Sequence, residues 1–222
     1  MIDWKDFDSH RLAAALRRVL ARGTPGWPAH RTMAPELAYG RHHGPIPDDV
    51  RRAAVLLVLD PSAGGWSIPA MLRPATMKAH AGQIALPGGL IESDETPAQT
   101  ALREFEEELG PSATGIEILG SLSPVFVFIS NFDVTPLLAV SHQPLVFQPN
   151  PVEVAEVVQI GVCDLLDPAS RGSHLIRRGD LEFRAPHFAI AAQRIWGATS
   201  LILAEFAELA GRLVVSQPLV GQ

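Results

Sequence analysis

Apolar residues recur along the first part of the chain with the spacing of a helix. Between residues 12 and 20, leucine and valine return every three or four positions, which places them along one face of a helix. Asp8 or Ser9 can cap this helix, and we expect it to continue to about Ala21. The pattern therefore predicts an amphipathic helix that packs one face against a core.

A second pattern, of nearly unbroken apolar runs, predicts strands. Residues 53–60 and 66–73 are two such runs, separated by a turn-forming Pro-Ser-Ala-Gly-Gly sequence, and they predict two strands of a buried sheet. Further strands are predicted at 115–122, 125–129, 134–140, 153–160 and 181–191, and further helices at 96–109, 162–167 and 198–211. Strands interspersed with a few helices favour an α/β (α+β) fold, in which helices cover a mixed sheet.

The segment between the first helix and the first strand has a different composition. Residues 23–50 contain five prolines and four glycines, which predicts irregular connecting structure. We therefore expect residues 1–48 to form an N-terminal helix and a Pro/Gly-rich arm, and residues 49–222 to form the main domain.

Composition narrows the class of protein. With 222 residues, 47% of them hydrophobic, the chain has enough apolar side chains for a sizeable core. The formal net charge of -6 argues against a nonspecific nucleic-acid binder, and the longest apolar runs are too short to cross a membrane. Cys163 is the only cysteine, so we expect no internal disulfide and no multi-cysteine zinc site. The first residues lack the basic and apolar regions of a secretory signal, which predicts a cytoplasmic protein.

The helix predicted at 96–109 has well-marked ends and carries an unusual run of acids. Thr96 can form a capping box with Gln99, and Gly110 can end the helix. Its last turns contain four glutamates in five positions. Like charges this close repel one another, and acids at a helix C-terminus oppose the helix dipole. The run therefore needs a specific explanation.

Three of these acids share one face of the predicted helix. Glu104, Glu107 and Glu108 lie within roughly 100° of arc, and the apolar residues form a different face. Carboxylate oxygens are suitable ligands for Mg²⁺ or Mn²⁺, and a bound cation would remove their repulsion. The alternative is a charged face that only contacts solvent.

The spacing of the residues around these acids favours the metal site. From Gly89 the sequence continues with five residues to Glu95, then seven more, and then Arg-Glu-Phe-Glu-Glu-Glu-Leu-Gly at 103–110. This resembles the Nudix box, Gly-x5-Glu-x7-Arg-Glu-U-x-Glu-Glu-x-Gly-U, where U is a bulky aliphatic residue. Phe105 and Pro111 stand where aliphatic residues are usual, and every invariant residue is present. The resemblance implies an α/β/α sandwich with a mixed sheet, in which this loop-helix-loop segment holds divalent cations against a diphosphate.

The same resemblance implies roles for the matching residues. Glu104, Glu107 and Glu108 would be metal ligands, and one of them would be a candidate for the general base that acts on the attacking water. Arg103 would hold Glu95, or a ligating glutamate, through a charge-assisted hydrogen bond.

Three further residues complete the implied catalytic set. The backbone of Gly88 and Gly89 would approach the metal and the phosphates closely, because glycine has no side chain to obstruct them. Glu153 is a second candidate for the general base, since Nudix enzymes often place an additional acid in that region. The alternative for Glu153 is an ordinary glutamate at the edge of a strand.

The segment before the box carries a second resemblance. Residues 71–89 are similar to the extra signature of the Nudix coenzyme A pyrophosphatase subfamily, although Lys78 stands in place of its second arginine and Leu86 in place of its phenylalanine. Lysine keeps the charge but lacks the planar fork that binds phosphate at two points. The resemblance implies substrate contacts from Arg73, Lys78, His80, Gly82 and Gly89.

Other residues are weaker candidates for substrate contacts. Arg31, Arg41, Arg51 and Arg52 could supply positive charge to a phosphate group, although most such arginines only contact solvent. Trp196 is expected in the core rather than as a platform for a nucleobase.

The leading hypothesis is a Mg²⁺- or Mn²⁺-dependent diphosphatase that splits coenzyme A, or a derivative of it, into 3′,5′-ADP and 4′-phosphopantetheine. One alternative keeps the chemistry and changes the substrate to NADH, ADP-ribose or a nucleoside triphosphate. Another is a Nudix-fold binding module without activity. The expected partner is a small-molecule diphosphate, with no nucleic acid and no membrane, and a homodimer is compatible with the sequence.

Overall fold

The computed structural model describes residues 4, 7–38, 40–43, 45–62, 65–77 and 80–215. The α-helices are α1 (Ser9–Leu20), α2 (Trp27–His30), α3 (Pro97–Leu109), α4 (Val162–Leu166) and α5 (Ala198–Val215), and the 3₁₀ helices are η2 (Glu36–Ala38), η3 (Arg41–His43) and η4 (Pro168–Ser170). The strands of the larger sheet are β1 (Arg51–Ser62), β2 (Gly65–Leu72), β3 (Ile84–Ala85), β4 (Gly88–Leu90), β5 (Ile116–Ser121), β6 (Val125–Val127), β7 (Phe132–Ser141) and β8 (Glu156–Gly161). Those of the smaller sheet are β9 (Arg171–Arg178), β10 (Leu181–Ile190) and β11 (Gln193–Ile195).

Strand β1 is the centre of a mixed sheet. It pairs in parallel with β7 and antiparallel with β2 and β4, and the registers place Arg51 opposite Phe132 and Val55 opposite Gly88. Strands β5 and β6 continue the sheet beyond β7, and β3 and β8 continue it beyond β2. Because β4 pairs with β1, the segment that leads into α3 is fixed directly against the middle of the sheet.

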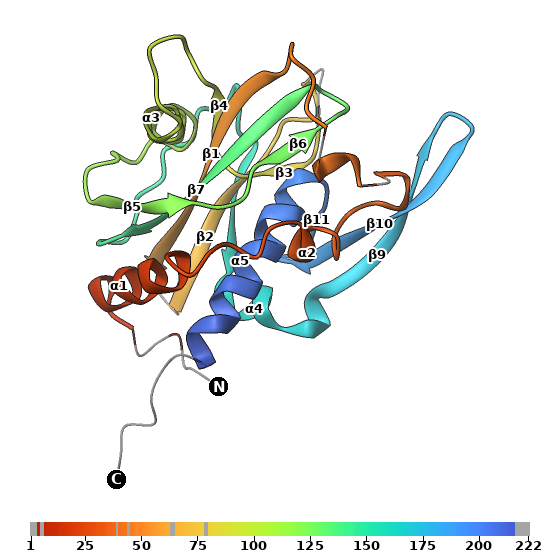
Figure 1. Ribbon diagram of the computed structural model, residues 1–222. Coiled ribbons are helices and arrows are strands. Elements are labelled where there is room, and N and C mark those ends of the chain that lie inside the picture. Colours follow the sequence, from red (N-terminus) through yellow and green to blue (C-terminus); the bar gives the residue numbers. More distant parts are fainter. Residues whose placement is uncertain are drawn as a thin grey trace.

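Helices cover both faces of this sheet (Figure 1). Leu57 and Leu59 of β1 belong to one apolar cluster, which they share with α1 and α5, whereas Leu56 and Val58 belong to a second cluster with Phe105 of α3. Successive residues of a strand point to opposite faces, so the unbroken apolar sequence of β1 supplies both clusters. The predicted α/β/α arrangement with a mixed sheet is confirmed.

The smaller sheet was not fully predicted. Strand β10 matches the predicted strand at 181–191, but its antiparallel partner β9 and the short β11 were missed. The β9–β10 hairpin extends away from the larger sheet at its turn end (Figure 1). Along β9, Arg171, Ser173 and Leu175 are all exposed.

The Pro/Gly-rich arm is anchored by a buried acid in α5. Glu205 is completely buried and accepts hydrogen bonds from Gly26 N (2.9 Å) and Ser123 Oγ (2.6 Å), and its Oε2 lies 2.9 Å from His30 Nε2. Burial opposes ionisation of Glu205, but these partners outweigh it and lower its pKa. Packing and polar contacts therefore join the arm to the C-terminal helix, and the division at residues 48 and 49 stays a prediction.

Most predicted elements are observed within two or three residues of their expected ends. Two boundaries differ most: the strand predicted at 153–160 begins at Glu156, because residues 151–153 form a turn, and the helix predicted at 198–211 continues to Val215. The short strands β3 and β4 were also missed. Within the described ranges, none of the helices is long and apolar enough to cross a membrane.

Candidate functional site

Both ends of α3 are fixed by local contacts. Thr96 N donates to Gln99 Oε1 (2.9 Å) and Gln99 N donates to Thr96 Oγ1 (3.3 Å), which is the predicted capping box. At the other end Gly110 adopts a left-handed conformation and donates its N–H to Glu106 O at 2.9 Å. With both ends fixed, the face of α3 that carries the acids is also fixed relative to the sheet.

Arg103 holds the acids of this segment together. Its Nε and Nη2 donate to the two oxygens of Glu95 at 2.7 and 3.0 Å, and its Nη1 donates to Glu104 (2.9 Å) and Glu107 (3.1 Å). The Arg103 hydrogen bonds, supported by one from Thr100, lower the pKa of Glu95 to about 2. The predicted contact between Arg103 and Glu95 is therefore present in the structure.

Glu108 occupies a different environment from its neighbours. It is 3% exposed, and its Oε2 accepts a hydrogen bond from Gly88 N at 2.9 Å. Burial raises the pKa of the Glu108 carboxyl to about 8, and the nearby charges of Glu104 and Glu153 add to this rise. The Gly88 N–H and the Arg73 guanidinium act in the opposite direction. The carboxyl of Glu108 therefore holds its proton to a higher pH than an exposed glutamate does.

The other two predicted ligands are progressively more exposed. The Glu104 side chain is 17% exposed and that of Glu107 is 58% exposed. Burial raises the pKa of Glu104, an effect that Arg103 reduces and that the charges of Glu107 and Glu153 reinforce. The three acids that share a face in the sequence thus range from buried to solvent-facing.

Gly88 and Gly89 pass too close to their neighbours to carry a side chain. A Cβ atom on Gly88 would lie 2.2 Å from the carbonyl oxygen of Ala54, and one on Gly89 would lie 2.3 Å from Glu104 Oε1. Gly88 also has a φ of +152°, a conformation that favours glycine. The backbone of β4 is therefore packed closely against β1 at Gly88 and against a carboxylate of α3 at Gly89, and its predicted approach to a metal and to phosphates stays a prediction.

The donor set suits a hard divalent cation. Mg²⁺ and Mn²⁺ prefer oxygen ligands such as carboxylates. The side chains of Glu104, Glu107 and Glu108 supply carboxylate oxygens beside β4. In the described part of the chain, however, no group of three or more acidic, histidine or cysteine side chains is arranged so that it could hold a metal ion without rearrangement. Arg103 engages Glu104 and Glu107, so a cation would have to replace part of those contacts.

Glu153 and Arg73 approach the same acids from other segments. Glu153 lies in the turn before β8 and is close enough for its charge to raise the pKa of both Glu104 and Glu108. Arg73 directly follows β2, and its guanidinium charge acts on Glu108. The structure therefore places Glu153 and Arg73 near the acids of α3, and their roles in catalysis and substrate binding stay predictions.

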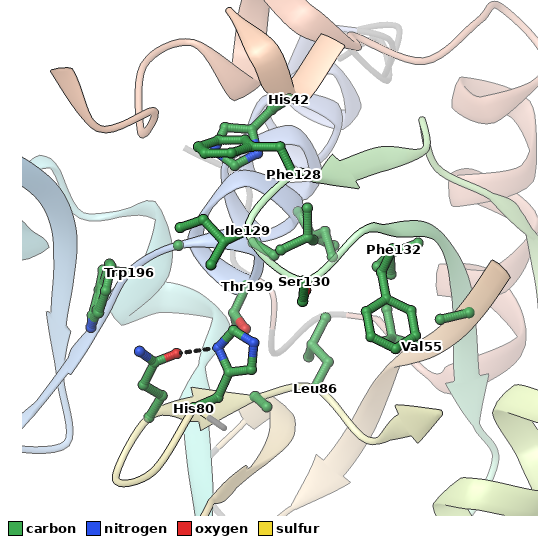
Figure 2. A pocket seen from close by; sticks show the side chains of 18 of the residues that line it. His42, Val55, His80, Leu86, Phe128, Ile129, Ser130, Phe132, Trp196 and Thr199 are labelled. Carbon is green, nitrogen blue, oxygen red and sulfur yellow. Dashed lines mark hydrogen bonds between the residues drawn. The ribbon is translucent and has the colours of Figure 1, made fainter. Parts of the chain in front are cut away.

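A pocket of about 690 Å³ opens beside Gly88 and Gly89 of β4. It reaches the acidic site through Gly88, Gly89 and Arg73, and the remainder of its wall is mostly apolar. Figure 2 shows Phe132 and Val55 on one side of the pocket and Trp196 on the opposite side. The prediction that Trp196 belongs to the core is therefore wrong, since its partly exposed ring borders the pocket.

The predicted substrate contacts fall into three groups. Arg73, His80 and Gly89 line the pocket, and His80 Nδ1 lies 3.0 Å from Gln83 Oε1 (Figure 2). Gly82 is not part of the pocket wall; it forms the turn behind it, where its N–H donates to Arg73 O at 3.1 Å. Lys78 lies outside the described residues.

Sequence reasoning missed the aromatic part of the pocket wall. Phe128 and Phe132 flank the turn between β6 and β7, and each ring lies under an arginine, at 4.0 Å from its Cζ atom. Those arginines, Arg41 and Arg51, were among four weak candidates in the sequence. No motif in residues 127–133 marks these rings as part of a pocket wall.

Comparison with known proteins identifies the family. The model of the NUDIX domain matches residues 50–175. The Nudix hydrolase NudL of Photorhabdus laumondii, itself uncharacterized, is 31% identical over 169 residues, which are 73% of this chain and 87% of that protein. Nudix hydrolase 3 of Caenorhabditis elegans is 29% identical over 166 residues, 68% of this chain and 69% of that protein.

A solved structure shows the same fold. The Nudix hydrolase RenU from Mycobacterium smegmatis matches with a TM-score of 0.50 and 21% sequence identity, over 78% of this chain and 90% of that chain. The chain therefore belongs to the Nudix hydrolase family, enzymes that hydrolyse diphosphate bonds in small-molecule substrates and generally use divalent metal ions such as Mg²⁺ or Mn²⁺.

Proposed function

We propose that this chain hydrolyses the diphosphate bond of coenzyme A, or of a coenzyme A derivative, to 3′,5′-ADP and 4′-phosphopantetheine. The observation that carries this proposal is Arg73, the arginine that matches the coenzyme A pyrophosphatase signature. Its Nε is buried and has no hydrogen-bond partner among the described residues. Its side chain lies between the pocket and Glu108.

A buried guanidinium nitrogen without a partner is costly, and an anionic ligand can satisfy it. A diphosphate that enters the pocket beside Gly88 and Gly89 meets Arg73 at the same point. The lining supports a substrate with both a charged centre and apolar or aromatic parts, as in coenzyme A. Arg73 would then orient the diphosphate next to the acids of α3.

The acids of α3 would supply the catalytic groups. Glu104, Glu107 and Glu108 would hold Mg²⁺ or Mn²⁺, which would neutralise charge on the diphosphate and help to activate water. Glu108 Oε2 is occupied by the Gly88 N–H, so its Oε1 is the atom that would contact the ion or take a proton from the attacking water. Glu153 is the alternative proton acceptor, since its position near Glu104 and Glu108 would bring it into reach of the same water.

A substrate panel tests the assignment. Purified protein with Mg²⁺ is given coenzyme A, dephospho-coenzyme A, NADH and ADP-ribose at equal concentrations, and the kcat/KM for each is measured with product identification. We expect coenzyme A or its acyl derivatives to have the highest kcat/KM. If coenzyme A is the poorest of the four, the assignment is wrong and a different nucleoside diphosphate derivative is the substrate. If none is hydrolysed but one binds, the chain is a binding module.

Two further expectations belong with this proposal. A diphosphatase of this kind would act on small molecules in the cytoplasm, which agrees with the sequence-based prediction. Self-association stays a prediction, and sedimentation of the purified protein tests it.

A further inference from the structure

Three arginines in the pocket wall form no ion pair with any acidic residue that the structure describes. They are Arg41, Arg51 and Arg73. The chain has a formal net charge of -6, so acids are not scarce in it. Positive charge that lines a pocket and has no paired carboxylate attracts an anionic ligand.

Arg73 lies near the acids of α3, whereas Arg41 and Arg51 line other parts of the pocket wall. Arg73 acts on Glu108, whereas Arg51 stands four residues along β1 from Val55, the residue paired with Gly88. Four residues of a strand span about 13 Å. The charge at Arg51 is therefore available to a group other than the diphosphate that is cleaved.

Arg41 and Arg51 are held in matching surroundings. Arg41 stacks on Phe128 and Arg51 on Phe132, each with its Cζ 4.0 Å from the ring centroid. Arg41 Nε donates to Ala38 O at 3.1 Å, and Arg51 Nη2 donates to Ser130 O at 2.8 Å. Each guanidinium keeps further N–H groups for a ligand, and ring stacking with backbone contacts limits its freedom to turn away.

The arm itself supports this part of the wall. His42 Nδ1 lies 2.9 Å from Phe126 O, and its ring lies 5.0 Å from that of Phe128 (Figure 2). His42 is buried and is also one of the residues that line the pocket, so its ring supports Phe128 and forms part of the wall. The arm thus contributes both the Arg41 cation and the support for the ring beneath it.

We propose that Arg41 and Arg51 form an anion subsite for a phosphate monoester of the substrate that is separate from the cleaved diphosphate. A phosphate monoester carries nearly two negative charges at neutral pH, and arginine can bind it through two parallel N–H groups. The proposal rests on the proposed function, in which the 3′-phosphate of coenzyme A is this group. Of the four arginines that the sequence suggested for phosphate binding, only Arg41 and Arg51 line the pocket. Arg52 follows Arg51 on a strand and so points to the opposite face.

Binding of two nucleotides that differ by one phosphate tests the subsite. Isothermal titration measures the Kd of 3′,5′-ADP and of 5′-AMP for the wild-type chain and for the Arg41→Ala and Arg51→Ala variants. We expect the wild-type chain to prefer 3′,5′-ADP by roughly tenfold or more, as for charge-assisted hydrogen bonds. Each variant should lose most of this preference while its Kd for 5′-AMP changes less than about twofold.

Matched variants and a second readout make the result decisive. Arg31→Ala, from the arm, and Arg52→Ala, from the same strand, should keep the wild-type preference, and Arg41→Lys and Arg51→Lys should keep part of it. Thermal melting identifies a variant that fails to fold, in which case the lysine variants carry the test. Equal affinity of the wild-type chain for both nucleotides, binding of neither, or an equal loss for both nucleotides in the alanine variants overturns the subsite. The two proposals can fail separately. If the chain prefers ADP-ribose to coenzyme A but shows the expected Kd pattern, the proposed function is wrong and the subsite is supported.

Discussion

Arg103 binds both carboxylate oxygens of Glu95, with Nε 2.7 Å from Oε1 and Nη2 3.0 Å from Oε2. This two-pointed contact fixes the plane of the guanidinium, and the remaining nitrogen, Nη1, then reaches Glu104 and Glu107. Glu95 does not need to contact a cation to affect the site. It sets the position of Arg103, which in turn sets the position of two candidate ligands.

Replacement of Arg103 by lysine should weaken the site. Lysine keeps the charge but cannot contact Glu95 at two points and also reach Glu104. We expect metal affinity or turnover to fall by about 10–100-fold, as for other residues that orient metal ligands. The measurement is kcat/KM as a function of Mg²⁺ concentration, with the exposed Arg22→Lys as a control. An unchanged Mg²⁺ dependence in Arg103→Lys would show that this contact has no part in positioning.

The two glycines of β4 should respond differently to alanine. In Gly89→Ala the new Cβ meets the end of the Glu104 side chain, which can move. In Gly88→Ala it meets the Ala54 carbonyl and the Val55 backbone, which cannot move without opening the sheet. We expect Gly89→Ala to retain most of its stability and lose metal-dependent turnover, and Gly88→Ala to lose stability. Urea denaturation and turnover of both variants check this, and equal stability losses would contradict it.

The raised pKa of Glu108 predicts a pH-dependent response to metal. Without metal, the folded chain keeps the Glu108 proton up to about pH 8, whereas the unfolded chain releases it near the ordinary glutamate value. Between these two pKa values the stability contribution of Glu108 therefore falls as pH rises. A cation that binds the ionised carboxylate reverses this loss, so the rise in Tm caused by Mg²⁺ should grow between pH 6 and pH 9. In Glu108→Gln that growth should be absent; a rise in Tm that is independent of pH in the wild-type chain would contradict the prediction.

The buried acid of α5 should be essential for stability. Glu205→Ala leaves the buried His30 and the half-buried N–H groups of Gly26 and Ser123 without their partner, and loss of a buried charged partner typically costs about 3–5 kcal/mol. Glu208→Ala, one turn further along the same helix, removes only a surface ion pair with Arg212, worth about 0.3–0.5 kcal/mol. Urea denaturation of both variants tests the difference. A Glu205→Ala variant as stable as Glu208→Ala would show that the arm is not held by this acid.

Local signals predicted the parts of this site that depend on local contacts. The ends of α3 were predictable because the Thr96 capping box and Gly110 act within a few residues. The alternation of faces on β1 follows equally directly from its long apolar run. The order of residues in the box then placed Arg103 beside Glu95.

Features that depend on packing were not predictable from the sequence. Glu104, Glu107 and Glu108 look equivalent on a helical wheel, and only the position of β4 above α3 makes Glu108 buried and Glu107 exposed. The role of Glu205 depends on contacts with residues more than eighty positions away. Strand β9 was missed because its residues are mostly polar and mostly exposed, whereas its partner β10 carries buried apolar residues such as Phe188.

The most direct test of the account replaces each candidate ligand with its neutral isostere. Turnover of coenzyme A is measured over a range of Mg²⁺ concentrations for the wild-type chain and for Glu104→Gln, Glu107→Gln and Glu108→Gln, with Glu106→Gln as the control from the same run. We predict Mg²⁺-dependent release of 3′,5′-ADP by the wild-type chain and by Glu106→Gln. The other three variants should lose more than about a hundredfold, which exceeds the range typical of residues that only orient ligands. Unchanged turnover and Mg²⁺ dependence in all three would contradict the proposal that α3 holds the catalytic metal.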